Sequence, residues 1–267
     1  NTDIKPYPGK INLYSAGSLS ALISLSDFEK NYGFEKPKNL QGSASLQGIL
    51  ELPLKMKIEP QEIKYKVSGI IEDLIISRET FPDYITSDGL SLEIKKSSLQ
   101  LNGEVAVGDI LADIKYVSGF GKEGSKITPS IEGKILISEN IFNTFHKEME
   151  NDRLTGSAPA FVFVDFPINQ DPTFRLTSNL QGLEVRLPEI GWEKNQSELA
   201  SLEVFGTIND GLQYNKFSFS GEDLEVSGKV KDNEAFVLER LLRDGILDVS
   251  GFLSNDGLKI TGGEFNL

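Results

Sequence analysis

Few residues in this chain are of a type that could do chemistry, and the single histidine is the first of them. The chain has one histidine, His146, and no cysteine. A lone histidine with neither cysteines nor a carboxylate constellation nearby lacks the partners of a metal ligand or a general base. The stretch 119–126, GFGKEGSK, has the residue types of a phosphate loop but not the G-x-x-x-x-G-K-[ST] spacing. We therefore expect the histidine to lie on the surface or to have its hydrogen bonds satisfied by neighbours. The stretch 119–126 is expected to be a flexible hairpin loop.

Paired carboxylates are the next possibility, because forty acidic residues offer many pairs. Glu51 and Asp165 stand at equivalent positions of two similar segments, which separates them by a whole structural unit. A glycosidase pair instead needs carboxyl groups that converge to about 5–9.5 Å. Asp83, Asp88 and the pair Asn209-Asp210 lack the spacing of a calcium-binding loop. Because no nucleophile, base and orienting group occur together, the sequence predicts a protein that is not an enzyme and holds no cofactor or metal.

Composition and charge exclude other classes. The 267 residues suffice for two average domains or one large all-β domain. A net charge of −13, with no run of lysines or arginines, argues against nucleic-acid binding. No apolar run approaches the roughly 18 residues of a membrane helix. The chain begins with neither a methionine nor a signal peptide, so we expect any anchor or export signal to lie outside this segment.

The elements that would position a site are organised around one duplicated stretch. Residues 42–56, GSASLQGILELPLKM, resemble residues 156–168, GSAPAFVFVDFPI, at an offset of 114 residues (42 to 156). In both copies apolar residues recur at every second position, which is typical of a strand with one face out of water. A strand of about 13 residues is longer than the usual five or six. We therefore expect two equivalent long strands, each followed by a further strand that contains Tyr65 or Phe174.

A short amphipathic helix is expected ahead of each long strand. The stretches 18–31 and 139–150 carry apolar residues at helical spacing, and each follows a serine suited to a helix N-cap. A third stretch, 233–243, places Leu238 and Leu241 three residues apart and is followed by a glycine suited to a helix end. The unit predicted is therefore strand, helix and long strand.

The repeats divide the chain into 1–132, 133–227 and 228–267, the last being the start of a third copy. The fold expected is mainly β: a long, curled, mostly antiparallel sheet, a half-barrel or β-groove, built from repeats of about 110 residues with short amphipathic helices. So many strands in one open sheet favour curling, which would place one apolar face in a trough. Residue pairs that tolerate positive φ predict hairpin turns. These pairs are Asp88-Gly89, Asn102-Gly103, Asp210-Gly211 and Asp256-Gly257.

These patterns resemble the AsmA-like superfamily of Gram-negative envelope proteins, and most closely its large YhdP-type members. The resemblance lies in 42–56 with its Glu-Leu-Pro-Leu, in 63–69, 88–94 and 99–105, and in the passage 156–187. Members look like long curled sheets whose concave apolar groove conducts phospholipid between the inner and outer membranes. Because they are several times longer and carry an N-terminal membrane helix, this chain is expected to be a fragment of a larger protein.

The resemblance implies a non-catalytic segment of a periplasmic lipid conduit that serves outer membrane biogenesis. The segment would be anchored to the inner membrane through a region not present here. The implied partners are phospholipid acyl chains, neighbouring repeats of the same chain and, through other regions, both membranes, with no nucleic acid. The candidate lipid-groove residues are Leu46, Leu50, Leu52, Leu54, Ile63, Tyr65, Val162, Val164, Phe166, Ile168, Phe174 and Leu176.

The same alternation is compatible with a closed core. In that alternative the strands form a β-sandwich or solenoid, and the protein is a structural scaffold or adhesin-like stalk that acts through its acidic surface. Whether the apolar faces around Leu52 and Phe166 are covered distinguishes the two hypotheses. Trp192, which follows a predicted strand, is expected to be a core or interface anchor rather than a platform for a ligand.

Overall fold

The chain forms one large antiparallel β-sheet. A computed structural model describes residues 8–18, 39–53, 59, 62–77, 84–108, 110–119, 124, 126–138, 153–209, 211–231, 235–254 and 257–266. The elements are β1 (Pro8–Ser18), β2 (Asn39–Pro53), β3 (Lys64–Ser77), β4 (Tyr84–Lys95), β5 (Ser98–Val107), β6 (Ile110–Gly119), β7 (Ser130–Ser138), β8 (Leu154–Asp165), β9 (Thr173–Ser178), β10 (Leu183–Leu187), the 3-10 helix η2 (Pro188–Ile190), β11 (Trp192–Lys194), β12 (Ser201–Ile208), β13 (Leu212–Ser220), β14 (Leu224–Lys231), β15 (Ala235–Arg243), β16 (Leu247–Ser254) and β17 (Gly257–Phe265).

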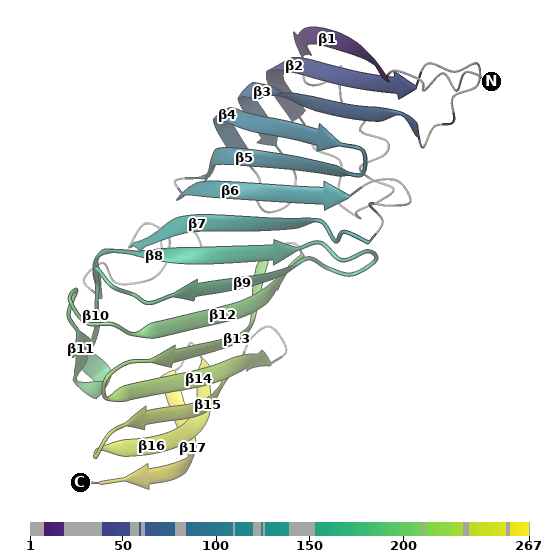
Figure 1. Cartoon of the computed structure of the whole chain (residues 1–267). Helices are drawn as coiled ribbons and strands as arrows, with labels where there is room; N and C mark the ends of the chain where they lie inside the picture. Colours follow the sequence, from purple (N-terminus) through teal and green to yellow (C-terminus); the bar gives the residue numbers. More distant parts are fainter. Residues whose placement is uncertain are drawn as a thin grey trace.

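The strands lie side by side almost entirely in chain order (Figure 1). β1 to β9 pair consecutively, β9 pairs with β12, and β12 to β17 again pair consecutively. β10 and β11 form a short ribbon that pairs with the beginning of β8. Among the described residues β1 pairs only with β2 and β17 only with β16, so the sheet is open at both ends. The expectation of a mainly β, antiparallel fold is confirmed.

Both long strands exist, and each pairs with a strand on either side. β2 has 15 residues and β8 has 12, and the following strands, β3 and β9, contain Tyr65 and Phe174 as expected. The sheet runs without interruption through the two expected repeat boundaries, because β7 spans 132–133 and β14 spans 227–228. The residues on the two sides of each expected boundary therefore belong to one strand, and the division into repeats of about 110 residues stays a prediction.

The third expected helix is wrong, because residues 235–243 form strand β15. Ser227 pairs with Arg240 and Gly228 with Leu238, which leaves Glu239 as an extra residue in a bulge. A bulge shifts the alternation of side chains by one position. Leu238 and Leu241 consequently lie on one face although they are three residues apart, a spacing that also suits a helix. The helices expected at 18–31 and 139–150 lie outside the described residues, apart from Ser18 at the end of β1.

The sheet is bent along two lines of irregular pairing. Near one margin the register shifts between Gln41 and Ser43 and between Thr86 and Leu90. Near the opposite margin, in the C-terminal half, shifts occur next to Gly206, Gly228 and Gly251. Bulges bend a strand and increase its twist. Figure 1 shows β2 to β5 turning to the back at the left and β12 to β17 turning to the back at the right.

Two of the four expected hairpin turns are instead parts of strands. Asp88-Gly89 lies at the register shift within β4, and Asn102-Gly103 lies inside β5. The actual turn between these strands is Lys96-Ser97. Glycine is required in β5 because Gly103 has φ +148 and a Cβ there would lie 2.6 Å from the carbonyl oxygen of Gly89. Asp210 and Asp256 lie outside the described residues, while the strands on either side of them pair as hairpins, with Ile208 opposite Leu212 and Ser254 opposite Gly257.

Candidate functional site: the apolar inner face

One unbroken row of apolar residues and glycines crosses the sheet. Each member pairs with the next on the neighbouring strand, from β2 to β17. At a strand spacing of about 4.8 Å the row is roughly 60 Å long. It consists of Ala44, Ile71, Leu90, Gly103, Ile114, Gly133, Val162, Leu176, Val204, Phe217, Gly228, Leu238, Gly251 and Ile260.

Two further rows of the same kind flank it, two residues away along each strand or three residues away where a bulge intervenes. One row consists of Leu46, Gly69, Leu92, Leu101, Tyr116, Ile131, Val164, Phe174, Gly206 and Tyr214. The other consists of Val105, Ala112, Ile135, Ala160, Ser178, Leu202, Phe219, Val226, Leu241, Val249 and Gly263. We call the surface that carries these three rows the inner face, and the opposite surface the outer face.

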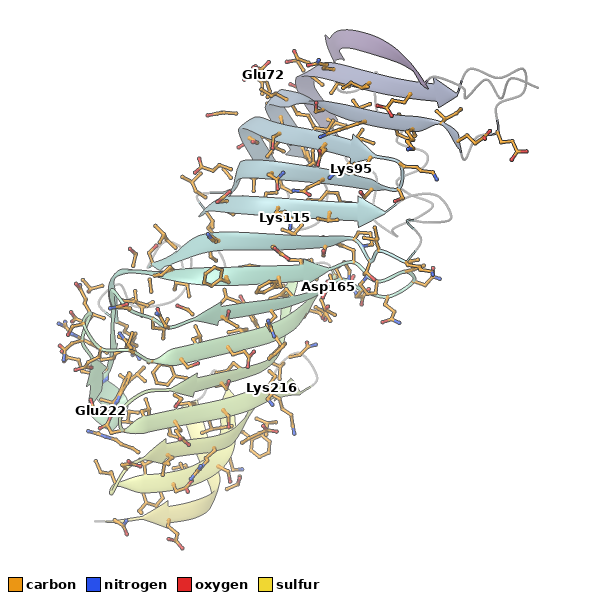
Figure 2. The ribbon with its side chains drawn as sticks, in the orientation of Figure 1. Glu72, Lys95, Lys115, Asp165, Lys216 and Glu222 are labelled. Carbon is orange, nitrogen blue, oxygen red and sulfur yellow. The ribbon has the colours of Figure 1, made fainter. Side chains whose placement is uncertain are left out.

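The two faces differ sharply in charge. No Asp, Glu, Lys or Arg occurs in the three rows of the inner face. The outer face carries ion pairs such as Lys66 to Glu93 (2.7 Å) and Lys229 to Glu239 (2.7 Å). Charged side chains lie along the whole sheet in Figure 2, where Lys95, Lys115 and Lys216 are labelled on strands from both halves. One surface of the sheet is thus apolar over its whole length, while the other is highly charged.

Much of the inner face stays partly exposed. Val162, Leu176 and Val204, in the middle of the central row, are neither fully buried nor fully exposed. The chain exposes 17147 Å², whereas a compact monomer of 29.5 kDa exposes about 11,500 Å². Buried positions are concentrated in three clusters along the sheet, around Leu90, around Ala158 and around Leu224. In its described part the protein is a single curled layer, with its apolar face only locally closed.

The first group of candidate residues lies on β2, on β3 and just before β3. Leu46 and Tyr65 are half-buried, and the hydroxyl of Tyr65 donates a hydrogen bond to the backbone oxygen of Lys96 (3.3 Å). Ile63 is half-buried and immediately precedes β3. In the backbone pairing Leu50 is opposite Tyr65 and Leu52 is opposite Gly9. Leu54 lies outside the described residues.

The second group of candidate residues lies on the adjacent strands β8 and β9 and just after β8. Val162 pairs with Leu176 and Val164 pairs with Phe174, so these four residues share the inner face. The Phe174 ring packs on Gly206 and meets Tyr214 edge to face, with ring centroids 6.0 Å apart. Burial raises the pKa of the Tyr214 hydroxyl.

The last two members of that group lie beyond the end of β8. Phe166 is half-buried, and its backbone N–H donates to the carbonyl oxygen of Pro129. Ile168 lies in a turn and is 62% exposed. The alternation of apolar residues therefore continues in the sequence after the strand itself has ended.

Sequence reasoning did not assign the strands outside the two duplicated segments to the same face. Ile114, Tyr116 and Ile131 join the two candidate groups across β6 and β7, and Val204 and Phe217 extend the face across β12 and β13. Alternation within 110–118 and 201–206 was the available signal. Only the pairing register shows that these residues face the same way.

A strap closes one margin of the inner face in the C-terminal half. The strap, residues 183–194, comprises β10, η2 and β11, and it places Trp192 in a cluster with Leu224, Leu238 and Val249. The Trp192 ring also meets Phe219 edge to face, with centroids 5.3 Å apart. Trp192 is therefore a core anchor, as expected. Figure 1 shows the strap running across the strand direction at the left margin.

A buried lysine fastens the strap. The Lys194 ammonium donates to the carbonyl oxygens of Leu180 and Leu183, each at 2.8 Å, and to that of Asn195 at 3.0 Å. Burial lowers its pKa, because desolvation disfavours the charged form. All three ammonium protons have an acceptor, so the charge is satisfied structurally.

The described residues provide an extended apolar surface. Within the described ranges, no group of three or more His, Cys, Asp or Glu side chains is placed to hold a metal ion. None of the helices that the structure describes is long and apolar enough to cross a membrane. Compared with known proteins, the chain matches no family model, no curated protein and no solved structure. The resemblance to the AsmA-like superfamily therefore stays a prediction.

Proposed function

We propose that this chain is one segment of a periplasmic conduit whose inner face carries phospholipid acyl chains between the inner and outer membranes. The observation that supports it is the inner face itself, a central apolar row about 60 Å long that is flanked by two shorter rows, with no charged residue in any of the three. That length is about twice the hydrocarbon thickness of a bilayer. Such a surface suits a ligand that is long and apolar.

Sliding requires that no position binds much more tightly than its neighbours. Each methylene group of an acyl chain gains about 0.8 kcal/mol when it leaves water for any part of an aliphatic surface. A cation on the inner face would hold a phosphate headgroup at one place. Because the rows carry only aliphatic, aromatic, glycine and serine residues, binding is spread along the face while the headgroup remains in water.

The open ends of the sheet suit a segment of a longer conduit. An edge strand presents unpaired N–H and C=O groups that favour pairing with a further strand. β1 and β17 are such edges in the described part of the chain. In this proposal neighbouring repeats extend the sheet, the anchor to the inner membrane lies in another region, and the segment needs neither cofactor nor catalytic residue.

Site-specific photo-crosslinking in a Gram-negative periplasm tests the proposal. Benzoylphenylalanine replaces Tyr116 on the inner face or, as the matched control, Phe205 on the outer face. After irradiation the protein is purified without detergent and analysed by mass spectrometry. We expect phospholipid adducts at position 116 and none at 205, because only the inner face offers a continuous apolar surface.

Substitutions of two adjacent residues supply a second test. Val204 lies on the inner face, and its neighbour Phe205 is 37% exposed on the outer face. We expect Val204→Asp to abolish co-purification of phospholipid and Phe205→Asp to leave it unchanged, with circular dichroism to confirm that both variants fold. A lipid-free protein with no adduct at position 116 would contradict the proposal and favour the closed-core scaffold.

A further inference from the structure

Four exposed large apolar side chains gather on the outer face, away from the proposed lipid surface. Leu111, Leu136, Phe161 and Leu199 are 58%, 59%, 47% and 62% exposed. Single exposed apolar residues are normal on a protein surface, but a contiguous group marks an interaction site. The pairing registers place Leu111, Leu136 and Phe161 on adjacent strands. Leu199 lines the same depression as Phe161.

The group crosses three adjacent strands. Leu111 and Leu136 are the next residues along β6 and β7 after the pair Ala112 and Ile135, so they lie opposite each other. Leu136 in turn pairs with Pro159 on β8, and Phe161 is the next outward residue of that strand. We call Leu111, Leu136, Pro159, Phe161 and Leu199 the outer patch.

The outer patch ends in an acidic hollow. A depression of about 740 Å³ has Pro159, Phe161, Leu199, Glu203 and Glu222 among its lining residues. Its lining includes no lysine, arginine or histidine. Figure 2 shows Glu222 at the margin of the sheet on the side of the strap. No described residue forms an ion pair with either carboxylate.

One lysine lies beside the outer patch. The Nζ of Lys134 lies 6.0 Å from the centroid of the Phe161 ring, and Lys134 is opposite Asp113 in the backbone pairing. The lining of the hollow itself includes two carboxylates and no cationic side chain. The surface therefore combines exposed apolar area with a negative depression, in a chain whose net charge is −13.

We propose that the outer patch and its hollow form a docking site for a basic, apolar segment of another protein. An aliphatic or aromatic side chain of that segment packs between Phe161 and Leu199, and a lysine or arginine beside it meets Glu203 and Glu222. Buried apolar anchors provide most of the affinity of such contacts, while charge complementarity selects the partner. The site lies on the face opposite the proposed lipid path, so it does not depend on lipid conduction.

Phage display of random dodecapeptides tests the site. The selected peptides are synthesised, and their affinity is measured by isothermal titration calorimetry. We expect peptides that combine Leu, Ile or Phe with Lys or Arg. Their affinity should fall at least about tenfold in Phe161→Ser/Leu199→Ser. In Glu203→Gln/Glu222→Gln the affinity should fall less, and it should no longer depend on the salt concentration. Ile70→Ser, which removes an outer-face side chain 51% exposed outside the patch, is the control and should bind normally.

Three results would overturn the proposal. The first is no enrichment of basic, apolar peptides. The second is binding that is equal in the patch variants and in Ile70→Ser. The third is a concentration-dependent dimer in analytical ultracentrifugation that Leu136→Ser abolishes, since a second copy of this chain would then be the occupant. The substituted apolar side chains are about half exposed or more, and Glu→Gln keeps the size of the side chain, so circular dichroism should show a retained fold.

Discussion

The indole Nε1 of Trp192 donates a hydrogen bond to Oδ1 of Asp223 at 2.7 Å, which ties the strap to the turn between β13 and β14. Arg243 supports the same junction, because its guanidinium lies 4.0 Å from Asp223 and donates to the carbonyl oxygen of Ile190. The three residues come from β11, from the β13–β14 turn and from the end of β15. The strap is thereby held to strands that lie far from β8, its pairing partner.

Replacing Asp223 by Ala should loosen the strap. The buried indole N–H would lose its acceptor, which costs about 1–3 kcal/mol of unfolding free energy. Since Trp192 is the only tryptophan, its fluorescence reports this junction alone, and the emission should shift to the red. Glu222→Ala, in the same turn, is the control. Equal stability and unchanged emission in Asp223→Ala would show that the bond does not hold the strap.

Acid should weaken the fold through Glu93 on the outer face. Hydrogen bonds from Lys66 and then Lys95 lower the pKa of Glu93 from 4.5 to about 2. A carboxyl group with a lowered pKa in the folded state stabilises the fold above its unfolded pKa, and this contribution is lost as the pH falls from about 4.5 to about 2. We expect the pKa of Glu93, measured by NMR titration, to move back toward 4.5 in Lys66→Met/Lys95→Met. An unchanged titration would disprove the role of these lysines.

Two glycines of the inner face should respond oppositely to alanine. A Cβ on Gly69 would collide with the carbonyl oxygen of Ser45, so Gly69→Ala should destabilise the protein by about 1–3 kcal/mol. A Cβ on Gly133 would meet nothing closer than the Ile114 methyl at 3.6 Å. Gly133→Ala should therefore stabilise by about 0.5–1 kcal/mol. Urea unfolding measures both, and a loss of stability in both variants would contradict the space seen at Gly133.

Deleting Glu239 should be tolerated, because it removes only the extra residue of the bulge in β15. Without it Leu238 and Leu241 stand two positions apart, which keeps both on the inner face of a regular strand, and the pairs Ser227–Arg240 and Gly228–Leu238 can persist. The cost should therefore stay below the roughly 1.5–3 kcal/mol of exposing a buried leucine. Glu239→Ala, the control, keeps the bulge and removes only the exposed ion pair with Lys229, so its effect should be small. Thermal unfolding compares the two, and a far lower midpoint for the deletion would show that the bulge itself stabilises the sheet.

Local pattern was enough to indicate much of the sheet. The alternation around Leu46 and around Val162 marked β2 and β8 as strands and told which of their residues share a face, because alternate side chains on a strand point to opposite sides. The same reasoning placed Tyr65 and Phe174 on the following strands. It could not find Ile114 or Val204 as members of the same face, since their position there depends on pairing with distant strands.

By itself, the sequence determined that the chain is made of long strands with one apolar side, because side-chain alternation is a local property of each strand. Tertiary structure alone decided where that alternation shifts. A spacing of three, as between Leu238 and Leu241, fits both a helix and a bulged strand, and hydrogen bonding to Ser227 and Gly228 selected the strand. A glycine that permits a tight turn also permits a bulge, and the partner strand placed Gly89 and Gly103 at an irregular pairing instead of a hairpin. Pairing between distant segments thus fixed the curl, the strap and the continuity of the inner face.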